Sequence, residues 1–293
     1  NLNDHGNELI GGLAELYTNA KSFRPEKAGR YRAPLQNMFQ RLLARARNED
    51  GLWFNLIRAS TGEVLNRATP DTWGYALGAL LNFGTATADD ALVGAVRQAL
   101  RNIDRPRYLD WNGADLYADS IEGALLLLNR LPEEPGWRWL EKVLPLFLGK
   151  QRDDGIVEGW YGDGNYARTA LMAGLYFTQG AMSRPWRSDL RLGAVREGDK
   201  MWIALAADKN WQGRLFFDAP RHRRILNLPV NYPRLNEFPE WFTIEAAARY
   251  QIKVGASKAI VRSGAELADG FPFQVKAGET RLVEVQPREG APD

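Results

Sequence analysis

Residues 116–130 read LYADSIEGALLLLNR, a stretch whose apolar residues recur at helical spacing. Two other stretches have the same texture, TWGYALGALLNF at 72–83 and ARTALMAGLYFT at 167–178. Helices rich in Gly, Ala and Leu pack closely on several sides, whereas the stretches at 34–48 and 87–103 carry charged outer faces. The sequence therefore predicts inner helices that alternate with outer ones.

The first 182 residues are expected to form helical hairpins. Pro34 is expected at the first position of one helix, and Thr69, Pro70 and Asp71 at the start of another, because a cap, an early proline and an early acid favour a helix N-terminus. The predicted helices span 7–20, 34–48, 70–83, 87–103, 116–130, 136–149 and 165–179.

A weak internal repeat joins these helices. ARARNEDGLW at 44–53 and GKQRDDGIVE at 149–158 both run from a basic helix end through an acidic pair to Gly and an apolar residue. Asp50 and Asp154 lie 104 positions apart, which is two units of about 52 residues. Helix pairs that repeat at about 50 residues, with a third and degraded copy near Asn102–Asp110, predict an α/α toroid.

A closed toroid of six hairpins needs twelve helices, and the seven predicted here match its C-terminal part. We therefore expect a chain beginning at Asn1 to be the later part of a longer protein. An N-terminal half of that protein, or another subunit, would complete the ring. The alternative is a half-ring that stands by itself.

The pattern changes after Pro185, where apolar and polar residues alternate between turn signals. We expect an α+β multidomain protein, with the helical toroid at 1–183 and an antiparallel β-sandwich of seven to nine strands at 186–289. LPVNYPRLNEFPEWF at 228–242 interrupts the strands with three prolines and four aromatic residues. This long excursion can reach the helical domain.

Composition excludes several classes of protein. The chain has 293 residues, of which 25% are charged, and a formal net charge of +2, so neither nucleic acid nor a membrane surface is an expected partner. It has no cysteine and only two histidines, His5 and His222, so we expect no metal site and no cofactor. No apolar run reaches the roughly 18 residues of a membrane span.

The loops that lead into inner helices gather around one mouth of a toroid, and here those loops are 50–71, 104–119 and 151–168. Asp119 and Glu122 lie three residues apart on one face of an otherwise apolar helix, so they must face water, a partner or a cavity. Candidate catalytic residues are Asp119, Glu122, Asp163 and Asp71. Candidate substrate-binding residues are Trp73, Trp111, Tyr117, Glu158, Trp160, Tyr161, Tyr166 and Arg168.

A structural interpretation of the same residues stays open. Asp71 and Asp115 suit helix starts, Asp50 and Asp154 precede glycine in turns, and Asp163 can cap a helix. Arg168 either pairs with the carboxylates or binds an anionic group of a substrate. The ten tryptophans and ten tyrosines suit a sugar-binding cleft or a core equally well.

The order of α/α hairpins followed by a β domain, with Asp-Gly loops and acidic aromatic rims, resembles bacterial carbohydrate-active enzymes. YADSIEGALLLLNR, GIVEGWYGDGNYART and YPRLNEFPEWFT carry the resemblance. Toroid glycoside hydrolases, including unsaturated glucuronyl hydrolases, and heparinase-type polysaccharide lyases share this plan. The resemblance implies a carbohydrate substrate and a periplasmic or secreted protein, while a cytoplasmic one stays open.

Three functions follow from this interpretation. The first is a glycoside hydrolase, in which two carboxylates drawn from Asp119, Glu122, Asp163 and Asp71 supply acid and base. The second is a polysaccharide lyase on a uronate chain, with Tyr161 or Tyr166 as the base and Arg168 neutralising the uronate. The third is a glycan-binding or scaffold protein without catalysis.

Overall fold

The computed structural model describes residues 1–3, 5–160 and 162–288. The chain is an α+β protein and divides into two compact units. The first unit comprises Asn1–Met172 and Asn227–Pro239, and the second comprises Ala173–Leu226 and Glu240–Asp293. The excursion predicted from the prolines at 228–242 thus belongs mostly to the helical unit.

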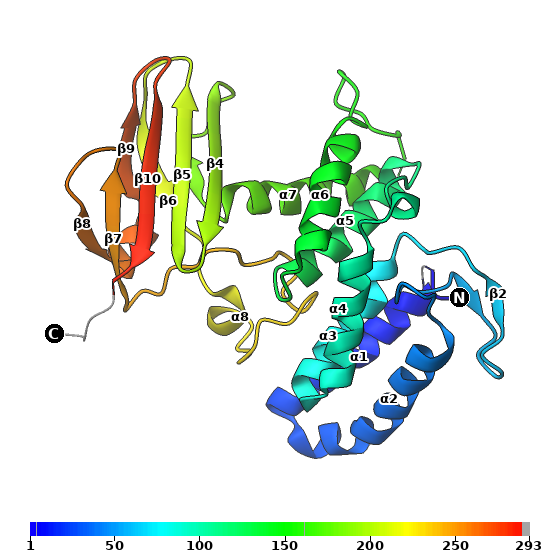
Figure 1. Ribbon diagram of the computed structural model, residues 1–293. Coiled ribbons are helices and arrows are strands. Elements are labelled where there is room, and N and C mark those ends of the chain that lie inside the picture. Colours follow the sequence, from blue (N-terminus) through cyan, green and yellow to red (C-terminus); the bar gives the residue numbers. More distant parts are fainter. Residues whose placement is uncertain (4, 161, 289–293) are drawn as a thin grey trace. The chain divides into compact units, whose positions relative to one another are not determined.

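Helices dominate the first unit (Figure 1). Each of the seven predicted helices is present, with ends shifted by four residues or fewer, except that the second begins nine residues earlier than predicted. They are α1 (His5–Phe23), α2 (Pro25–Arg45), α3 (Trp73–Thr87), α4 (Asp90–Asn102), α5 (Ala114–Leu128), α6 (Glu134–Leu148) and α7 (Gly162–Thr178). Between them lie the short strands β1 (Leu56–Ile57) and β2 (Val64–Asn66) and the 3₁₀ turn η1 (Pro106–Tyr108).

Burial separates only two of the predicted inner helices from the rest. In α3 and in α5 nearly every residue is buried, whereas α2, α4 and α6 bury one face only, and α1 and α7, also predicted as inner helices, have exposed faces as well. Helix α3 packs against α1, α4 and α5, and α6 packs against α4 and α5. Small residues let α3 and α5 approach closely: a Cβ at Gly74 would lie 2.5 Å from the Cα of Gly123.

Two predicted helix starts are wrong. Helix α2 begins at Pro25, whose missing N–H costs nothing at a first position, and it continues through Pro34. Helix α3 begins at Trp73, because Pro70 and Asp71 lie in a turn before it. The hydroxyl of Thr72, the N-cap residue of α3, accepts a hydrogen bond from Asn7 and caps nothing.

The two copies of the repeated Asp-Gly loop have the same backbone geometry. Gly51 and Gly155 have φ angles of 87° and 84°, which only glycine adopts readily. In each loop the N–H of this glycine donates to the carbonyl three residues earlier, that of Asn48 or Arg152. Each loop is closed by a second backbone bond, in which the N–H of Asn48 or Arg152 donates to the carbonyl of Leu52 or Ile156. The sequence repeat is therefore a repeat of local structure.

The second unit consists of two antiparallel sheets and two short helices (Figure 1). The larger sheet has the order β4-β5-β10-β7-β8 and the smaller has the order β3-β6-β9. Alternate residues of both sheets enter one hydrophobic core, which includes Ile203, Leu215, Phe273 and Val283. The elements are β3 (Met182–Arg184), β4 (Leu190–Glu197), β5 (Lys200–Ala207), β6 (Trp211–Phe216), α8 (Arg221–Arg224), β7 (Arg249–Val254), β8 (Ile260–Ser263), α9 (Gly264–Ala268), β9 (Phe271–Val275) and β10 (Thr280–Pro287).

The close approach of α3 and α5 gives a first prediction. Gly123→Ala places a Cβ 2.7 Å from the Cα of Gly74, so the helices must separate, and we expect a loss of about 1–3 kcal/mol in the free energy of unfolding. Gly94→Ala is the control, because this exposed helical glycine has no atom within 4 Å of the new Cβ; we expect it to be stabilising by up to about 1 kcal/mol. Chemical denaturation measures both, and equal effects would contradict the close packing.

Candidate functional site

One face of α5 carries three carboxylates, at Asp115, Asp119 and Glu122. Their spacing of four and then three residues places them above one another on the helix. Glu122 is completely buried and Asp119 is 9% exposed. As predicted, these two acids share one face of an apolar helix. Together with Tyr75, Arg168 and Arg234 they form the charged centre of the helical unit.

The hydroxyl of Tyr75, on α3, bridges the two buried carboxyls. It lies 2.6 Å from Oδ1 of Asp119 and 3.1 Å from Oε2 of Glu122. Because a phenol has a single proton, it donates to one of them at a time. The shorter distance favours Asp119 as the acceptor.

Two arginines compensate the charge of Glu122. Arg168, on α7, binds Oε2 of Glu122 and lies 3.6 Å from Oδ1 of Asp119. Arg234, from the segment 227–239, lies 3.2 Å from Oε1 of Glu122, and its guanidinium stands 4.0 Å from the centre of the Tyr75 ring. A buried carboxylate needs partners of this kind, because burial alone disfavours its charge.

The amide of Asn165 adds a contact one helical turn before Arg168. It donates to Oδ1 of Asp115 at 2.8 Å and approaches Oδ1 of Asp119 at 3.3 Å. Asn165 and Arg168 lie three residues apart, so one face of α7 matches the acidic face of α5.

Asp119 is an acid whose protonation differs strongly from that of a free side chain. Burial raises its pKa to about 7, and the hydrogen bond from Tyr75 lowers it in part. The negative charges of Glu122, Asp71 and Asp115 add to the rise. About half of the Asp119 side chains therefore hold a proton at neutral pH.

The pKa values of the neighbouring groups shift for related reasons. Burial raises the pKa of Glu122, against the effect of Arg234 and Arg168. Burial also raises the pKa of Tyr75 strongly, and the two carboxylates add to this. Tyr75 is thus a hydrogen-bond donor over the whole physiological range and cannot serve as a base.

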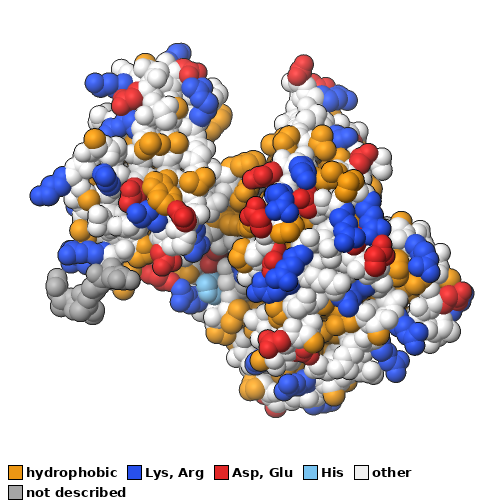
Figure 2. Space-filling model, viewed as in Figure 1, with side chains coloured by type: hydrophobic (Ala, Val, Ile, Leu, Met, Phe, Trp, Pro, Cys, Tyr) orange, Lys and Arg blue, Asp and Glu red, His pale blue; other side chains and the backbone are white. Residues whose placement is uncertain are grey.

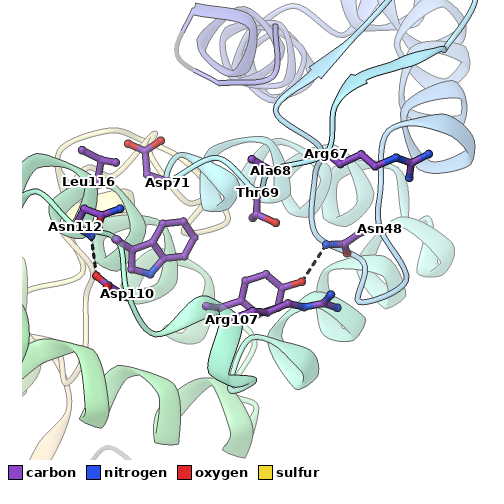
Figure 3. Close-up of a pocket in the computed structure, with 11 residues that line it drawn as sticks. Asn48, Arg67, Ala68, Thr69, Asp71, Arg107, Asp110, Asn112 and Leu116 are labelled. Atoms are coloured by element: carbon purple, nitrogen blue, oxygen red, sulfur yellow. Dashed lines mark hydrogen bonds between the residues drawn. The ribbon is translucent and has the colours of Figure 1, made fainter.

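A pocket of about 400 Å³ opens in the same unit, beside the loops that lead into α3 and α5 (Figure 3). Asp71, Asp110 and Trp111 line it, together with residues from the end of α2 and from η1. Trp111 is 6% exposed, and its buried indole N–H has no hydrogen-bond partner. The remaining lining residues are Asn48, Arg67, Ala68, Thr69, Arg107, Tyr108, Asn112 and Leu116.

The third predicted loop, 151–168, and Lys150 immediately before it contact the second predicted loop, 104–119. Glu158 accepts a hydrogen bond of 2.6 Å from the N–H of Ala114, the first residue of α5, and Lys150 donates to the carbonyl of Asn112. Glu158 thus stabilises the start of a helix belonging to another hairpin. Asp115, expected to cap this helix, lies inside its first turn instead.

Several predicted site residues have structural positions, which corrects their assignment. Trp73 is fully buried, donates to Ser120 at 2.7 Å and packs edge-on against Trp139. Tyr117 is buried and its hydroxyl bonds Leu109 and Asp110, while Tyr166 stacks on Phe147 and donates to Leu148. None of these three rings lines the pocket of about 400 Å³, so their aromatic surface belongs to the core.

The remaining predicted residues divide between the loop and the charged centre. Asp163 accepts hydrogen bonds from the N–H groups of Glu158 and Gly159, which lower its pKa, so it fixes the loop. Trp160 is 42% exposed and its indole bonds Glu158. Tyr161 lies outside the described residues. Glu122 is too deeply buried to touch a substrate, which removes it from the catalytic candidates.

The sequence interpretation missed Tyr75, Asn165 and Arg234. Tyr75 has a weak signal, since its hydroxyl is a polar group within the mostly apolar stretch TWGYALGALLNF. For Arg234, the sequence offered only the expectation that the segment 228–242 reaches the helical domain. Its partner Glu122 lies 112 residues earlier, so no local pattern connects the two.

Other kinds of site find little support in the part of the chain that the structure describes. These residues include no group of three or more His, Asp or Glu side chains placed to hold a metal ion. No described helix has both the length and the apolar character to cross a membrane. On the face shown in Figure 2, basic and acidic side chains are interspersed. No family model and no curated protein matches the chain.

The raised pKa of Asp119 gives a second prediction. Because the folded protein keeps this proton and the unfolded chain releases it near pH 4, the free energy of unfolding falls as pH rises from about 4 to about 7. The loss is at most about 4 kcal/mol for a rise of roughly three pH units. Asp119→Asn has no such dependence, so its stability relative to the wild type improves across this window.

Denaturation at a series of pH values measures this difference. Tyr75→Phe is the informative companion, because loss of the donated hydrogen bond raises the pKa of Asp119 further and extends the window upward. Parallel stability curves for the wild type and Asp119→Asn between pH 4 and 7 would contradict the assignment.

Proposed function

We propose that this protein is a carbohydrate-active enzyme, a glycoside hydrolase in which Asp119 is the general acid. The observation that supports it is a carboxyl with a pKa of about 7, held by Tyr75 and Asn165, whose neighbour Asp71 lines a polar pocket. An acid that holds its proton at neutral pH can donate it to a departing glycosidic oxygen.

Asp71 is the second carboxylate of this proposal. It is half-buried, and its charge contributes to the rise in the pKa of Asp119. Glycosidic cleavage uses an ionised carboxylate as nucleophile or as base opposite the acid. Asp71 takes that part here, whereas Glu122 acts only through Tyr75.

The pocket suits a sugar unit because it combines aromatic edges with many hydrogen-bonding groups. Trp111 and Tyr108 supply apolar surface, and Asn48, Asn112 and Arg67 supply polar groups. Pockets that fix a small ligand have this mixture of apolar wall and few convergent polar groups.

The fold part of the proposal is an incomplete α/α toroid followed by a β-sandwich. The all-round burial of α3 and α5, the one-sided burial of α2, α4 and α6, and the shared core of the two sheets support it. Leu9, Leu16 and Phe23 form an exposed apolar stripe on α1. Further hairpins of the same protein would cover this stripe, and we propose that such a protein acts in the periplasm or outside the cell.

A polysaccharide lyase is the second candidate, because the Arg168 side chain is 30% exposed beside Asp119 and offers a cation to a uronate. The base is the weak point of this candidate. Of the two bases expected from sequence, Tyr166 is buried and bonded to a carbonyl, and Tyr161 lies outside the described residues, while Tyr75 holds its proton too firmly. The hydrolase therefore stays first.

The experiment incubates the protein with neutral and uronate-containing oligosaccharides and follows new reducing ends together with the ultraviolet absorbance of an unsaturated uronate. Under hydrolysis, Asp119→Asn should lower kcat/KM by about 10²–10⁴, and wild-type activity should decline as pH rises above about 7. Asp104→Asn is the control, because this carboxylate pairs with Arg138 and Lys142 on the surface.

Reducing ends without absorbance support the hydrolase, and both signals together support the lyase. Glycan binding without either product would replace both proposals with a non-catalytic protein. Full activity of Asp119→Asn would remove Asp119 from the mechanism.

A further prediction concerns Trp111. Trp111→Ala should weaken oligosaccharide binding about fivefold, since an aromatic contact contributes about 1 kcal/mol, and Trp111→Phe should have a smaller effect. Trp186→Ala is the matched control, because this indole is 75% exposed in the second unit. Calorimetric titration measures the affinities, and unchanged binding by folded Trp111→Ala would contradict a sugar in this pocket.

A further inference from the structure

The segment 227–239 comes from between the strands of the second unit, yet it belongs to the helical unit. Two contacts hold its backbone: Asn82 donates to the carbonyl of Pro233 at 3.0 Å, and Arg130 donates to the carbonyl of Asn231. Between these anchors and Glu237 lies Arg234, whose φ angle is 63°. A left-handed φ is uncommon for a residue other than glycine and persists only where surrounding contacts hold it.

Those contacts converge on the charged centre. The Arg234 guanidinium lies over the Tyr75 ring and reaches the Glu122 oxygen that Arg168 does not use. One carboxylate thus receives one guanidinium on each oxygen. The mechanism proposed above gives Arg234 no contact with substrate, so its position requires another explanation.

The charge of Glu122 depends on these two cations. Glu122 is completely buried, and burial raises its pKa, while Arg234 is the strongest influence in the opposite direction, followed by Arg168. Removing Arg234 leaves burial opposed by a single guanidinium. The loss of Arg234 therefore shifts Glu122 further toward its neutral form.

The charge of Glu122 in turn acts on Asp119. The two carboxyls share the Tyr75 hydroxyl, and the negative charge of Glu122 favours the proton on Asp119. A neutral Glu122 removes this influence, and it leaves Arg168, at 3.6 Å, to favour the ionised form of Asp119.

We propose that Arg234 is a positioning residue for Asp119 that acts through Glu122: the docked segment 227–239 places a cation on the buried Glu122 carboxyl and favours its ionised form, and that charge favours the proton on Asp119, which shares the Tyr75 hydroxyl with Glu122. The role of Asp119 as a general acid rests on the proposed function, but the electrostatic coupling of Arg234, Glu122 and Asp119 does not. The segment thereby becomes part of the site, which is complete only when residues 227–239 lie on the helices.

The charged and titratable groups around Asp119 come from every neighbouring element. They are Tyr75 on α3, Asp71 before it, Asp115 and Glu122 on α5, Arg168 on α7, Arg234 and Glu237 on the segment, and Glu15 on α1, which interacts with the last two. Of the groups beyond direct contact with Asp119, Arg234 has the strongest effect on the charge of Glu122.

The test is a carbon-13 NMR titration of the Asp119 carboxyl in the full chain, which needs no substrate. We expect Arg234→Ala to lower the pKa of Asp119 by about one pH unit or more. Arg234→Lys keeps a cation and should restore most of the wild-type value. Glu122→Gln should lower the pKa in the same direction, because it removes the same charge.

The double variant Glu122→Gln/Arg234→Ala separates this coupling from a direct effect. With no charge at position 122, loss of Arg234 should lower the pKa of Asp119 no further, so the two effects are not additive. Arg130→Ala is the control: it removes another contact of the same segment and leaves the Arg234 charge in place, and we expect an unchanged pKa. Circular dichroism verifies that each variant is folded.

An unchanged or raised pKa in folded Arg234→Ala overturns the proposal, and so does an unchanged pKa in Glu122→Gln if Arg234→Ala does not fold. A purely structural Arg234 would lower stability without moving the titration. If Asp119→Asn keeps full activity while the titration moves as expected, the proposed function fails and the coupling stands. If the protein is active, the alkaline limb of its pH profile should move down with the NMR value.

Discussion

The burial of Glu122 is the constraint on which the helical unit depends. A carboxylate without solvent is unstable unless cations and hydrogen bonds surround it, and here they come from three places in the chain. Tyr75 arrives from α3, Arg168 from α7, and Arg234 from a segment that lies between strands of the second unit. The position of this one residue therefore fixes which helix faces meet and where residues 227–239 lie.

Much of the helical architecture follows from sequence because its cause is local. Apolar spacing and Gly-Ala-Leu texture predict each helix, and the Asp-Gly loops at Asp50 and Asp154 predict turns that the structure contains. The errors at Pro34 and Pro70 have different sources. Helix α2 already begins at another proline, Pro25, and continues through Pro34, whereas Pro70 opens a turn that precedes α3.

The site was predictable only in part, for a different reason. Asp119 and Glu122 are recognisable because charged residues in an otherwise apolar helix need an explanation. Arg168 is recognisable for the same reason in the last predicted helix. The basic partner Arg234 is not recognisable from sequence. It looks like any other arginine of a polar loop, and only the structure shows its contact with Glu122, which lies 112 residues earlier. The aromatic residues predicted to bind substrate include buried ones such as Trp73, because the sequence does not distinguish a core tryptophan from one that faces a ligand.

The composition of the charged centre argues that stability did not shape it. Replacing a buried ion pair with apolar residues is often neutral or stabilising, so a network of this kind is weak support for a fold. Here acids outnumber bases, since Asp71, Asp115, Asp119 and Glu122 face two arginines. Burial is the first cause of the raised pKa of Asp119, and the excess of acids over bases adds to it. Groups with strongly shifted pKa values cluster at functional sites, and this is why the proposed function is centred on Asp119.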